Sequence, residues 1–301
     1  MNDKLLKKLA NPMLLAAPII WGSSFVVMKH SLDSFTPMYL LAIRFTLAAL
    51  VLGIVFFRMW RNLDASYWKA GAIVGGCLFL AYAFQTYGLA HTTSGKNAFL
   101  TAVYCVIVPF LNWLIVKHKP DKYNLLAALI CIVGIGMVSL GGTEAGGLTI
   151  NIGDALTLVG GFFFAAHIVA VNKFADGRDI FLITTLQFAF FALYSWIGAI
   201  AFREPLPTNL SGTALWGLVY LVIFSSCGAL LFQNIGQKYT APATAAVILS
   251  LEAPFGVLTS VLVGEENLNT IMVLGFVLIF IAVICSETKF SFLRKGEKTK
   301  S

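Results

Sequence analysis

One carboxylate, Glu252, lies in the middle of a long apolar segment, where its side chain has no water around it. The segment runs from about Ala241 to Val263, and as a helix it places Glu252 near the midplane of a bilayer. An acidic side chain at that depth costs about 2.5 to 3.5 kcal/mol, so such residues usually face a bundle interior and mark a transport pathway or a proton relay. Pro254 removes a backbone hydrogen bond of the same helix, which favours a polar site there. The alternative is a protonated Glu252 that only bonds a neighbouring helix.

A cation, Arg44, lies inside a second apolar segment, at 37–57. At helical rise it is roughly 12 Å from the end of that segment. Two interpretations stay open. In the first, the guanidinium reaches the headgroups, as long cationic side chains do near helix ends. In the second, Arg44 faces a cavity, where it binds a substrate carboxylate or neutralises Glu252.

Other polar side chains lie at similar depths in other apolar segments. His167 is either a neutral ring bonded to a backbone carbonyl or a substrate ligand, and with Glu252 it is a candidate for proton coupling. Tyr82, Gln85 and Thr86 are spaced i, i+3 and i+4, so they share one helix face. Such a face suits a ligand with a flat apolar part and polar edges.

We therefore predict a substrate site that combines aromatic faces, neutral polar groups and one charge of each sign: Trp21, Ser24, Arg44, Tyr82, Gln85, Asn97, Tyr104, His167, Gln187, Gln233 and Glu252. No catalytic residue, metal site or cofactor is predicted. The four histidines and the acids are scattered, and the sequence has no phosphate-binding loop, H-E-x-x-H or nucleophile elbow. The five cysteines lie in apolar segments without C-x-x-C spacing, as small core residues do.

Composition identifies an integral membrane protein. The 301 residues are 58% hydrophobic and 12% charged, about half the charge of a soluble domain. The net charge of +7 follows the loops, so it does not indicate a nucleic-acid partner. The expected partners are the lipid bilayer and a small-molecule substrate, with no ATPase domain in this chain.

Ten transmembrane helices are predicted, at 12–30, 37–57, 68–89, 97–116, 124–141, 154–173, 180–201, 212–234, 242–263 and 270–286. Short connections make neighbouring helices antiparallel. One side then collects 17 of the 21 basic residues and the other side only three, with Arg44 inside the membrane. By the positive-inside rule both termini are expected in the cytoplasm.

The two halves of the chain resemble each other weakly. A shift of 143 residues lays Arg44 on Gln187 and Ser24 on His167, and a shift of 148 residues lays Tyr104 on Glu252. Five helices per half is an odd number, so the second half must enter the membrane from the opposite side, as in inverted-repeat transporters. We expect an all-α integral membrane fold of two inverted five-helix repeats around a central cavity, at residues 1–142 and 153–287, with a basic cytoplasmic tail at 288–301.

Five sequence stretches carry a resemblance to a known family: W-G-S-S-F (Trp21 to Phe25), A-I-R-F (Ala42 to Phe45), F-L-T-A-V-Y-C-V-I-V-P (Phe99 to Pro109), G-D-A-L-T-L-V-G-G-F-F-F-A-A-H (Gly153 to His167), and A-A-V-I-L-S-L-E-A-P-F followed by G-E-E (Ala245 to Phe255, Gly264 to Glu266). In order and spacing the chain resembles an EamA-type permease of the drug/metabolite transporter superfamily. The resemblance implies two inverted repeats, alternating access and, usually, export. The family's substrates include amino acids, sugars, nucleotide-like and vitamin-like compounds, and toxic amphiphiles.

We expect a secondary transporter in the cell membrane that exports amino acids or related small amphipathic metabolites. The alternatives are a permease for drugs and toxic amphiphiles, or for vitamin- or nucleotide-like metabolites. An integral-membrane enzyme is disfavoured because the loops hold no catalytic cluster. A channel is disfavoured because no charged ring or carbonyl filter is visible. An inverted pair within one chain can already enclose a complete pathway, so a single chain can be the functional unit, and the oligomeric state stays open.

The predicted topology can be tested by cysteine labelling with a membrane-impermeant reagent. Cysteines in place of Gly146 and Asn267 should label from outside the cell, because both lie in loops on the side that is poor in basic residues. Lys119→Cys should label only after the membrane is opened. If Lys119→Cys labels from outside while the other two do not, the map is reversed.

Overall fold

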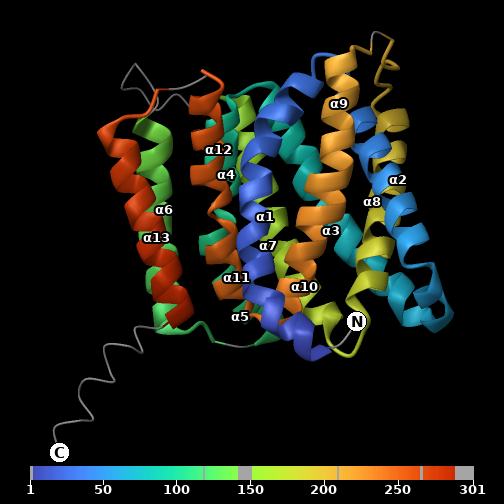
Figure 1. Cartoon of the computed structure of the whole chain (residues 1–301), viewed down its shortest axis with the longest axis horizontal. Helices are drawn as coiled ribbons and strands as arrows, with labels where there is room; N and C mark the ends of the chain where they lie inside the picture. Colours follow the sequence, from blue (N-terminus) through green and yellow to red (C-terminus); the bar gives the residue numbers. More distant parts are fainter. Residues whose placement is uncertain (1–2, 118, 142–150, 209, 265–266, 289–301) are drawn as a thin grey trace, which may run out of the picture.

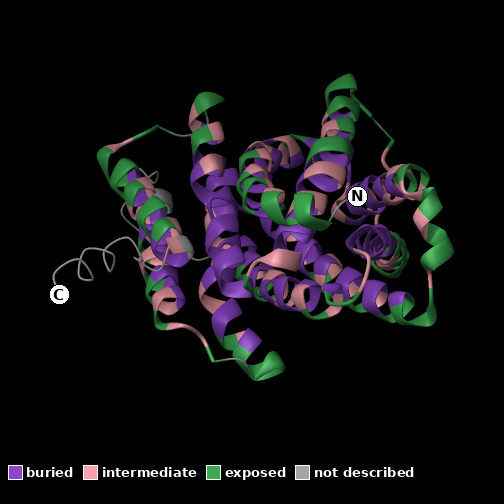
Figure 2. Ribbon diagram, turned by 60° about the horizontal axis from the view of Figure 1, so that its bottom comes forward, coloured by how far each residue is buried: buried purple, intermediate pink, exposed green. Residues whose placement is uncertain are grey.

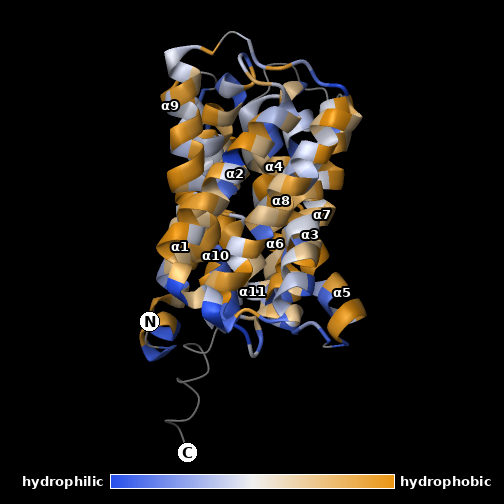
Figure 3. Ribbon diagram, turned by 90° about the vertical axis from the view of Figure 1, so that its right-hand side faces the viewer, coloured by the Kyte–Doolittle hydropathy of each residue, from blue (hydrophilic) through white to orange (hydrophobic). Residues whose placement is uncertain are grey.

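A computed structural model describes residues 3–117, 119–141, 151–208, 210–264 and 267–288, and all of them lie in helices, turns and loops (Figure 1). The helices form a bundle whose apolar residues make a band between two hydrophilic ends (Figure 3). Many large apolar side chains on the outer faces are exposed, as Leu262, Trp216 and Ile200 illustrate, whereas the residues between helices are buried (Figure 2). An apolar exterior of this kind is typical of a protein surrounded by lipid.

The ten predicted segments are confirmed as helices, with some changes in their ends. In chain order the elements are α1 (Asp3–Ser31), α2 (Pro37–Val55), a 3₁₀ turn η1 (Phe57–Asn62), α3 (Ala65–Ala90), α4 (Ser94–Thr101), α5 (Tyr104–Val116), α6 (Lys122–Gly141), α7 (Ile152–Ala175), α8 (Ile180–Ala201), α9 (Gly212–Tyr220), the π-helical η2 (Leu221–Leu230), α10 (Leu231–Tyr239), α11 (Pro242–Leu249), α12 (Glu252–Leu262) and α13 (Thr270–Thr288). Eight spans, counting α4–α5, α9–η2–α10 and α11–α12 as one each, are long and apolar enough to cross a membrane, and α6 and α13 contain two shorter apolar helices.

Helix ends follow from the local sequence. Asp64, Asp179 and Ser211 precede α3, α8 and α9, and their side chains accept hydrogen bonds from the first free backbone N–H groups. Pro242 begins α11 at a position where the missing N–H costs nothing. Capping groups of this kind lie at both ends of the bundle, where apolar helices must expose unpaired backbone to the interface.

The inverted repeat is visible in the two spans that break. In the first half, α4 runs from Ser94 to Thr101 and α5 begins at Tyr104. In the second half, α11 has the same limits after a shift of 148 residues, and α12 begins at Glu252, the equivalent of Tyr104. The second break lies four residues before Pro254, where the proline ring would clash with the carbonyl of Ser250. The two broken spans run in opposite directions, so that α4 packs on α12 and α5 packs on α11 (Figure 1).

The remaining helices pack across the halves in matching pairs. The third helix of each half lies against the first helix of the other half, which brings α3 onto α7 and α10 onto α1. The last helices, α6 and α13, pack on each other at one edge of the bundle (Figure 1). The two halves are therefore interleaved, and any polar group at their boundary faces the other half.

The exact division at 142 and 153 stays a prediction, as does the basic tail. Residues 142–150 and 289–301 lie outside the described residues, and so do Gly146 and the pair Glu265 and Glu266 of the G-E-E motif.

Close contact between α1 and α12 depends on Gly22. A Cβ atom on Gly22 would lie 2.5 Å from the Cβ of Phe255, 2.6 Å from its carbonyl carbon and 2.9 Å from the nitrogen of Gly256. Because two of these atoms belong to the backbone, α12 would have to move as a unit.

We predict that Gly22→Ala lowers the stability of the protein by about 1 to 3 kcal/mol, the usual cost of overpacking. Gly136→Ala is the matched control, because a Cβ on Gly136 in α6 would meet nothing within 4 Å. Alanine favours a helix by about 1 kcal/mol over glycine, so the control should be neutral or stabilising. Thermal unfolding in detergent micelles measures both. Equal midpoints for the two variants would contradict the predicted role of Gly22.

Candidate functional site

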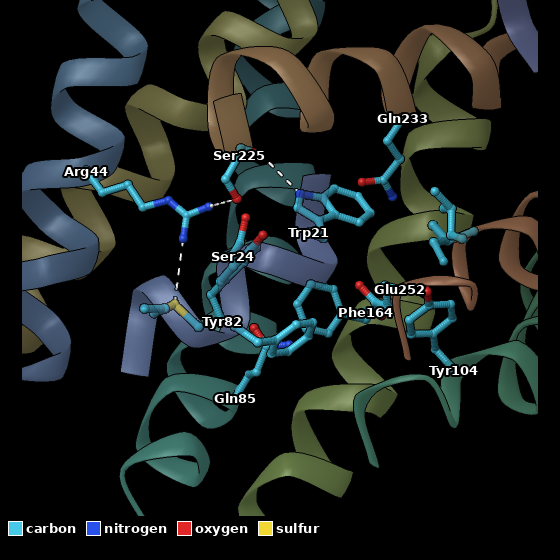
Figure 4. Close-up of a pocket in the computed structure, with 14 residues that line it drawn as sticks. Trp21, Ser24, Arg44, Tyr82, Gln85, Tyr104, Phe164, Ser225, Gln233 and Glu252 are labelled. Atoms are coloured by element: carbon cyan, nitrogen blue, oxygen red, sulfur yellow. Dashed lines mark hydrogen bonds between the residues drawn. The ribbon is translucent and has the colours of Figure 1, made fainter. Parts of the chain in front are cut away.

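A cavity lies in the middle of the bundle, between the two halves (Figure 4). Fourteen residues from both halves line it: Trp21, Ser24, Phe25, Met28, Arg44, Tyr82, Gln85, Tyr104, Phe164, Ile168, Ser225, Gln233, Leu249 and Glu252. Eight of the eleven residues in the predicted site are among them, namely Trp21, Ser24, Arg44, Tyr82, Gln85, Tyr104, Gln233 and Glu252. The structure brings these residues together from helices far apart in the chain.

The cavity lies on the axis that relates the two repeats. Four pairs of equivalent residues line it. A shift of 143 residues relates the pairs on the first helix of each half, and a shift of 148 residues relates the pairs on the third and fourth helices. The pairs are Trp21 with Phe164, Phe25 with Ile168, Gln85 with Gln233, and Tyr104 with Glu252. Each half thus supplies an aromatic face, an aliphatic or aromatic neighbour, an amide and a hydroxyl or carboxyl group.

Arg44 and the residues around it break this symmetry. Its Nε donates to Ser226 Oγ at 2.7 Å and its Nη2 to Ser225 Oγ at 2.9 Å. The guanidinium carbon lies 5.1 Å from the ring centre of Tyr82 and 5.2 Å from that of Phe45. Arg44 is 1% exposed, so the interpretation in which it reaches the headgroups is wrong. Within the described residues, all of these partners are neutral, and the buried guanidinium pairs with no acid.

The serines reach Arg44 because η2 is π-helical. A π-helix changes the register of the side chains along the span, and π segments often occur at functional sites. Here consecutive residues, Ser225 and Ser226, both bond to the guanidinium. The carbonyl of Ser225 also accepts a hydrogen bond from Trp21 Nε1 at 3.1 Å. Trp21 and Arg44 are therefore fixed by the same turn of η2.

Glu252 lies at the opposite end of the cavity from Arg44, beside Tyr104 (Figure 4). It is the first residue of α12, directly after the helix break, and is 5% exposed. In the described part of the chain, neither its Oε1 nor the hydroxyl of Tyr104 has a hydrogen-bond partner. No ion pair joins Glu252 to Arg44 there, so the two charges do not neutralise each other by direct contact. Trp21 and Phe164 lie between them in this view.

Three predicted site residues do not line the cavity. Asn97 is fully buried, and its Nδ2 donates to Thr157 Oγ1 at 2.7 Å and to the carbonyl of Gln85 at 3.2 Å. His167 Nε2 and Gln187 Oε1 are 3.5 Å apart, and both residues are completely buried. His167 thus contacts a side-chain amide, not the backbone carbonyl that was one expectation.

Sequence analysis missed six lining residues. Phe164 could have been found, because it is the repeat equivalent of Trp21, whereas Phe25 and Ile168 are equivalents of each other and neither was predicted. Met28 follows Ser24 by one helical turn. Ser225 carries no such signal, since its position depends on the π-helical register.

The cavity is small, with a volume of about 30 Å³. That volume suffices for a water molecule or two, but a metabolite needs far more. The helices must therefore separate before a substrate can enter. Among the described residues no three His, Cys, Asp or Glu side chains lie close enough together to hold a metal ion.

Comparisons with known proteins agree with this architecture. The model of the EamA-like transporter family matches residues 8–140 and again residues 151–288. A protein of Archaeoglobus fulgidus named "Uncharacterized transporter" is 33% identical over 271 residues, which cover 90% of this chain and 83% of the relative. Protein PecM of Dickeya dadantii is 26% identical over 93% of this chain and 92% of its own length.

A solved structure supports the fold independently. A crystal structure superposes with a TM-score of 0.77 over 95% of this chain and 99% of the other, at 18% sequence identity. At this sequence identity, the superposition is evidence for the fold but not for the function. The relatives' names point to a transporter rather than to an integral-membrane enzyme. With the double family match, the chain belongs to the EamA-like transporter family, as a multi-pass membrane protein of ten helices in two inverted repeats.

Proposed function

We propose that this transporter exports amino acids or closely related small zwitterions by alternating access, with the central cavity as the substrate site. The observation that carries the proposal is that Arg44 and Glu252 line one cavity without pairing. A substrate with a carboxylate and an ammonium group supplies the missing partner to each. An apolar side chain fits the aromatic walls formed by Trp21 and Phe164.

Other substrate classes fit this lining less well. A sugar asks for more hydrogen-bonding groups than the amides of Gln85 and Gln233 and the nearby hydroxyls supply. A polyphosphate asks for several cations, whereas Arg44 is the single cationic residue among those that line the cavity. Neutral amphiphiles and drug-like compounds remain the competing class, because aromatic walls bind them as well.

The binding residues in this proposal are the eight predicted residues that line the cavity. Asn97, His167 and Gln187 are assigned to support of the helices instead. Proton coupling, if transport uses it, is assigned to Glu252 alone, since His167 is 0% exposed and lies outside the cavity. In this proposal the protein lies in the cell membrane with both termini in the cytoplasm, and one chain is the functional unit.

Direct counterflow of radiolabelled amino acids in liposomes tests the substrate class. We expect saturable exchange that is competed by amino acids with apolar side chains. Competition by uncharged amphiphiles, with none by any amino acid, would exclude the proposed substrates and leave the family assignment unchanged.

Arg44→Met tests whether the cation is kept for function. A buried charge without a counter-ion is expensive, and apolar residues of similar volume are often neutral or stabilising in its place. We predict that Arg44→Met retains or raises the unfolding temperature while amino-acid counterflow falls about tenfold or more, which is 1.4 kcal/mol in binding. Gln187→Met is the matched control, because Gln187 occupies the equivalent position outside the cavity and should keep transport. Loss of transport in both variants would contradict the assignment.

Glu252→Gln tests the carboxylate. Glutamine keeps the size and much of the hydrogen bonding, so a structural Glu252 should tolerate the change. We predict normal membrane levels but at least about a tenfold loss of transport, because the amide cannot take up a proton or pair with an ammonium group. Loss of the pH dependence of the remaining transport would indicate proton coupling. Asp64→Asn, a capping carboxylate far from the cavity, should change neither property.

A further inference from the structure

An ion pair joins the two halves at the end of the bundle where α4 and α7 begin. Lys96 Nζ lies 2.6 Å from Asp154 Oδ2, and the side chains are 25% and 1% exposed. Thr92 Oγ1 donates to the other oxygen of Asp154 at 2.9 Å. Because Lys96 and Thr92 belong to the first half and Asp154 to the second, the halves cannot separate here without breaking both bonds. We call this end of the bundle the Lys96 end.

A second layer of polar contacts lies between this ion pair and the cavity. Asn97, next to Lys96 on α4, donates to Thr157 of α7 at 2.7 Å. The same amide donates to the carbonyl of Gln85, a residue of the cavity wall. The Lys96 end is thus closed by hydrogen bonds between the halves from its outer layer to the wall of the cavity.

The inverted repeat supplies a matched comparison at the opposite end, which we call the Asn11 end. Asn11 of α1 is the repeat equivalent of Asp154, and Thr244 of α11 is the equivalent of Lys96. Both are neutral. The bond from Thr92 to Asp154 recurs as a bond from Thr240, the equivalent of Thr92, to Asn11 at 3.4 Å. At that length it is close to the limit of a hydrogen bond.

The second layer of contacts, between the outer residues and the cavity, is also polar at the Lys96 end and apolar at the Asn11 end. The equivalents of Asn97 and Thr157 at the Asn11 end are Ala245 and Leu14, both apolar. The backbones nevertheless approach equally closely at both ends. A Cβ on Gly88 would lie 2.2 Å from Thr157 Oγ1, and one on its equivalent Gly236 would lie 2.4 Å from Leu14 Cγ. Two further bonds join the halves at the Asn11 end: Tyr239 donates to Asp3 on the exposed surface, and Thr244 donates to Asn124 of α6 at 3.4 Å. The two ends therefore share a geometry but differ in their contacts, because only the Lys96 end has, among the described residues, an ion pair with a buried carboxylate.

We infer that Lys96 and Asp154 form the gate at the Lys96 end, and that without substrate the protein opens preferentially at the Asn11 end. Charge-assisted hydrogen bonds are roughly twice as strong as neutral ones. Each conformation of an alternating-access cycle opens one end while it closes the other, so unequal contacts at the two ends set the resting population. The inference rests on the alternating access proposed above, and in the proposed topology the Asn11 end faces the cytoplasm. An exporter with this bias waits open to the compartment where its substrate is made.

Hydrogen–deuterium exchange of the full chain in lipid nanodiscs, without substrate, tests the gate. Lys96→Gln removes the cation and leaves the other bonds of Asp154 in place. We expect severalfold faster exchange in α4 and, reciprocally, severalfold slower exchange in α11 at the Asn11 end. Lys96→Arg keeps the charge and should behave as the wild type. Arg203→Gln, which removes an exposed cation at the same end, is the control and should change neither region.

A designed second gate tests the same inference in the other direction. Asn11→Asp combined with Thr244→Lys places the charges of the ion pair at the Asn11 end. The double variant should exchange more slowly in α11 and faster in α4, and each single variant, which lacks a partner, should not.

The reciprocal response separates a gate from a local support. If Lys96→Gln loosens only α4 and leaves α11 unchanged, or if Arg203→Gln has the same effect as Lys96→Gln, the ion pair is a static brace and the inference is wrong. Because the exchange is measured without substrate, its outcome does not depend on the substrate class. Conversely, a failure of amino-acid counterflow with reciprocal exchange intact would overturn the substrate proposal and leave the gate standing.

Discussion

Lipid offers no hydrogen bonds, so every polar group of a membrane-spanning bundle must find its partner inside the protein. Arg44 shows how far this constraint reaches. Its guanidinium needs several acceptors at mid-depth, and a regular α-helix presents only one residue in three or four to any given neighbour. The π-helical η2 brings Ser225 and Ser226 to it together. The same turn offers the Ser225 carbonyl to Trp21, so one irregular segment fixes both the cation and the aromatic wall of the cavity.

The repeat explains where the cavity lies, and the differences between the halves explain its polarity. Equivalent helix breaks at 102–103 and 250–251 meet near the axis, which places Tyr104 and Glu252 on opposite halves of one site. If the halves were identical in sequence, the same side chain would occupy both of these positions, and the two sides of the site would carry the same charge. Substitution of a single residue type, hydroxyl for carboxyl, is enough to give the axis one anionic side. Arg44 supplies the cationic side, since its own equivalent, Gln187, is neutral and does not line the cavity.

Much of this arrangement can be predicted from the sequence, for reasons that also explain the failures. Glu252 and Arg44 stand out because charge in an apolar segment is costly, and cost by itself implies an interior position. The shift of 148 residues predicts that Tyr104 lies near Glu252 in the cavity, because helix breaks and their neighbours are copied with the repeat. Depth, however, does not determine the direction in which a helix presents a residue. His167 and Gln187 are the repeat equivalents of Ser24 and Arg44, yet they contact each other outside the cavity. Ser225 was missed because a π-helix shifts the register in a way that no sequence period reveals.

The separation of the two charges is itself the feature that suits a transporter. A direct pair between Arg44 and Glu252 would compensate both groups and leave little for a ligand to add. Instead the aromatic rings of Trp21 and Phe164 are seen between them in Figure 4, and the neutral hydroxyls of Ser225 and Ser226 bind the guanidinium. The buried guanidinium of Arg44 therefore carries an electrostatic cost that an empty site does not relieve. In the proposed function a zwitterion pairs with Arg44 through its carboxylate and with Glu252 through its ammonium group. The free energy of this pairing favours the conformation in which the two halves close around the substrate.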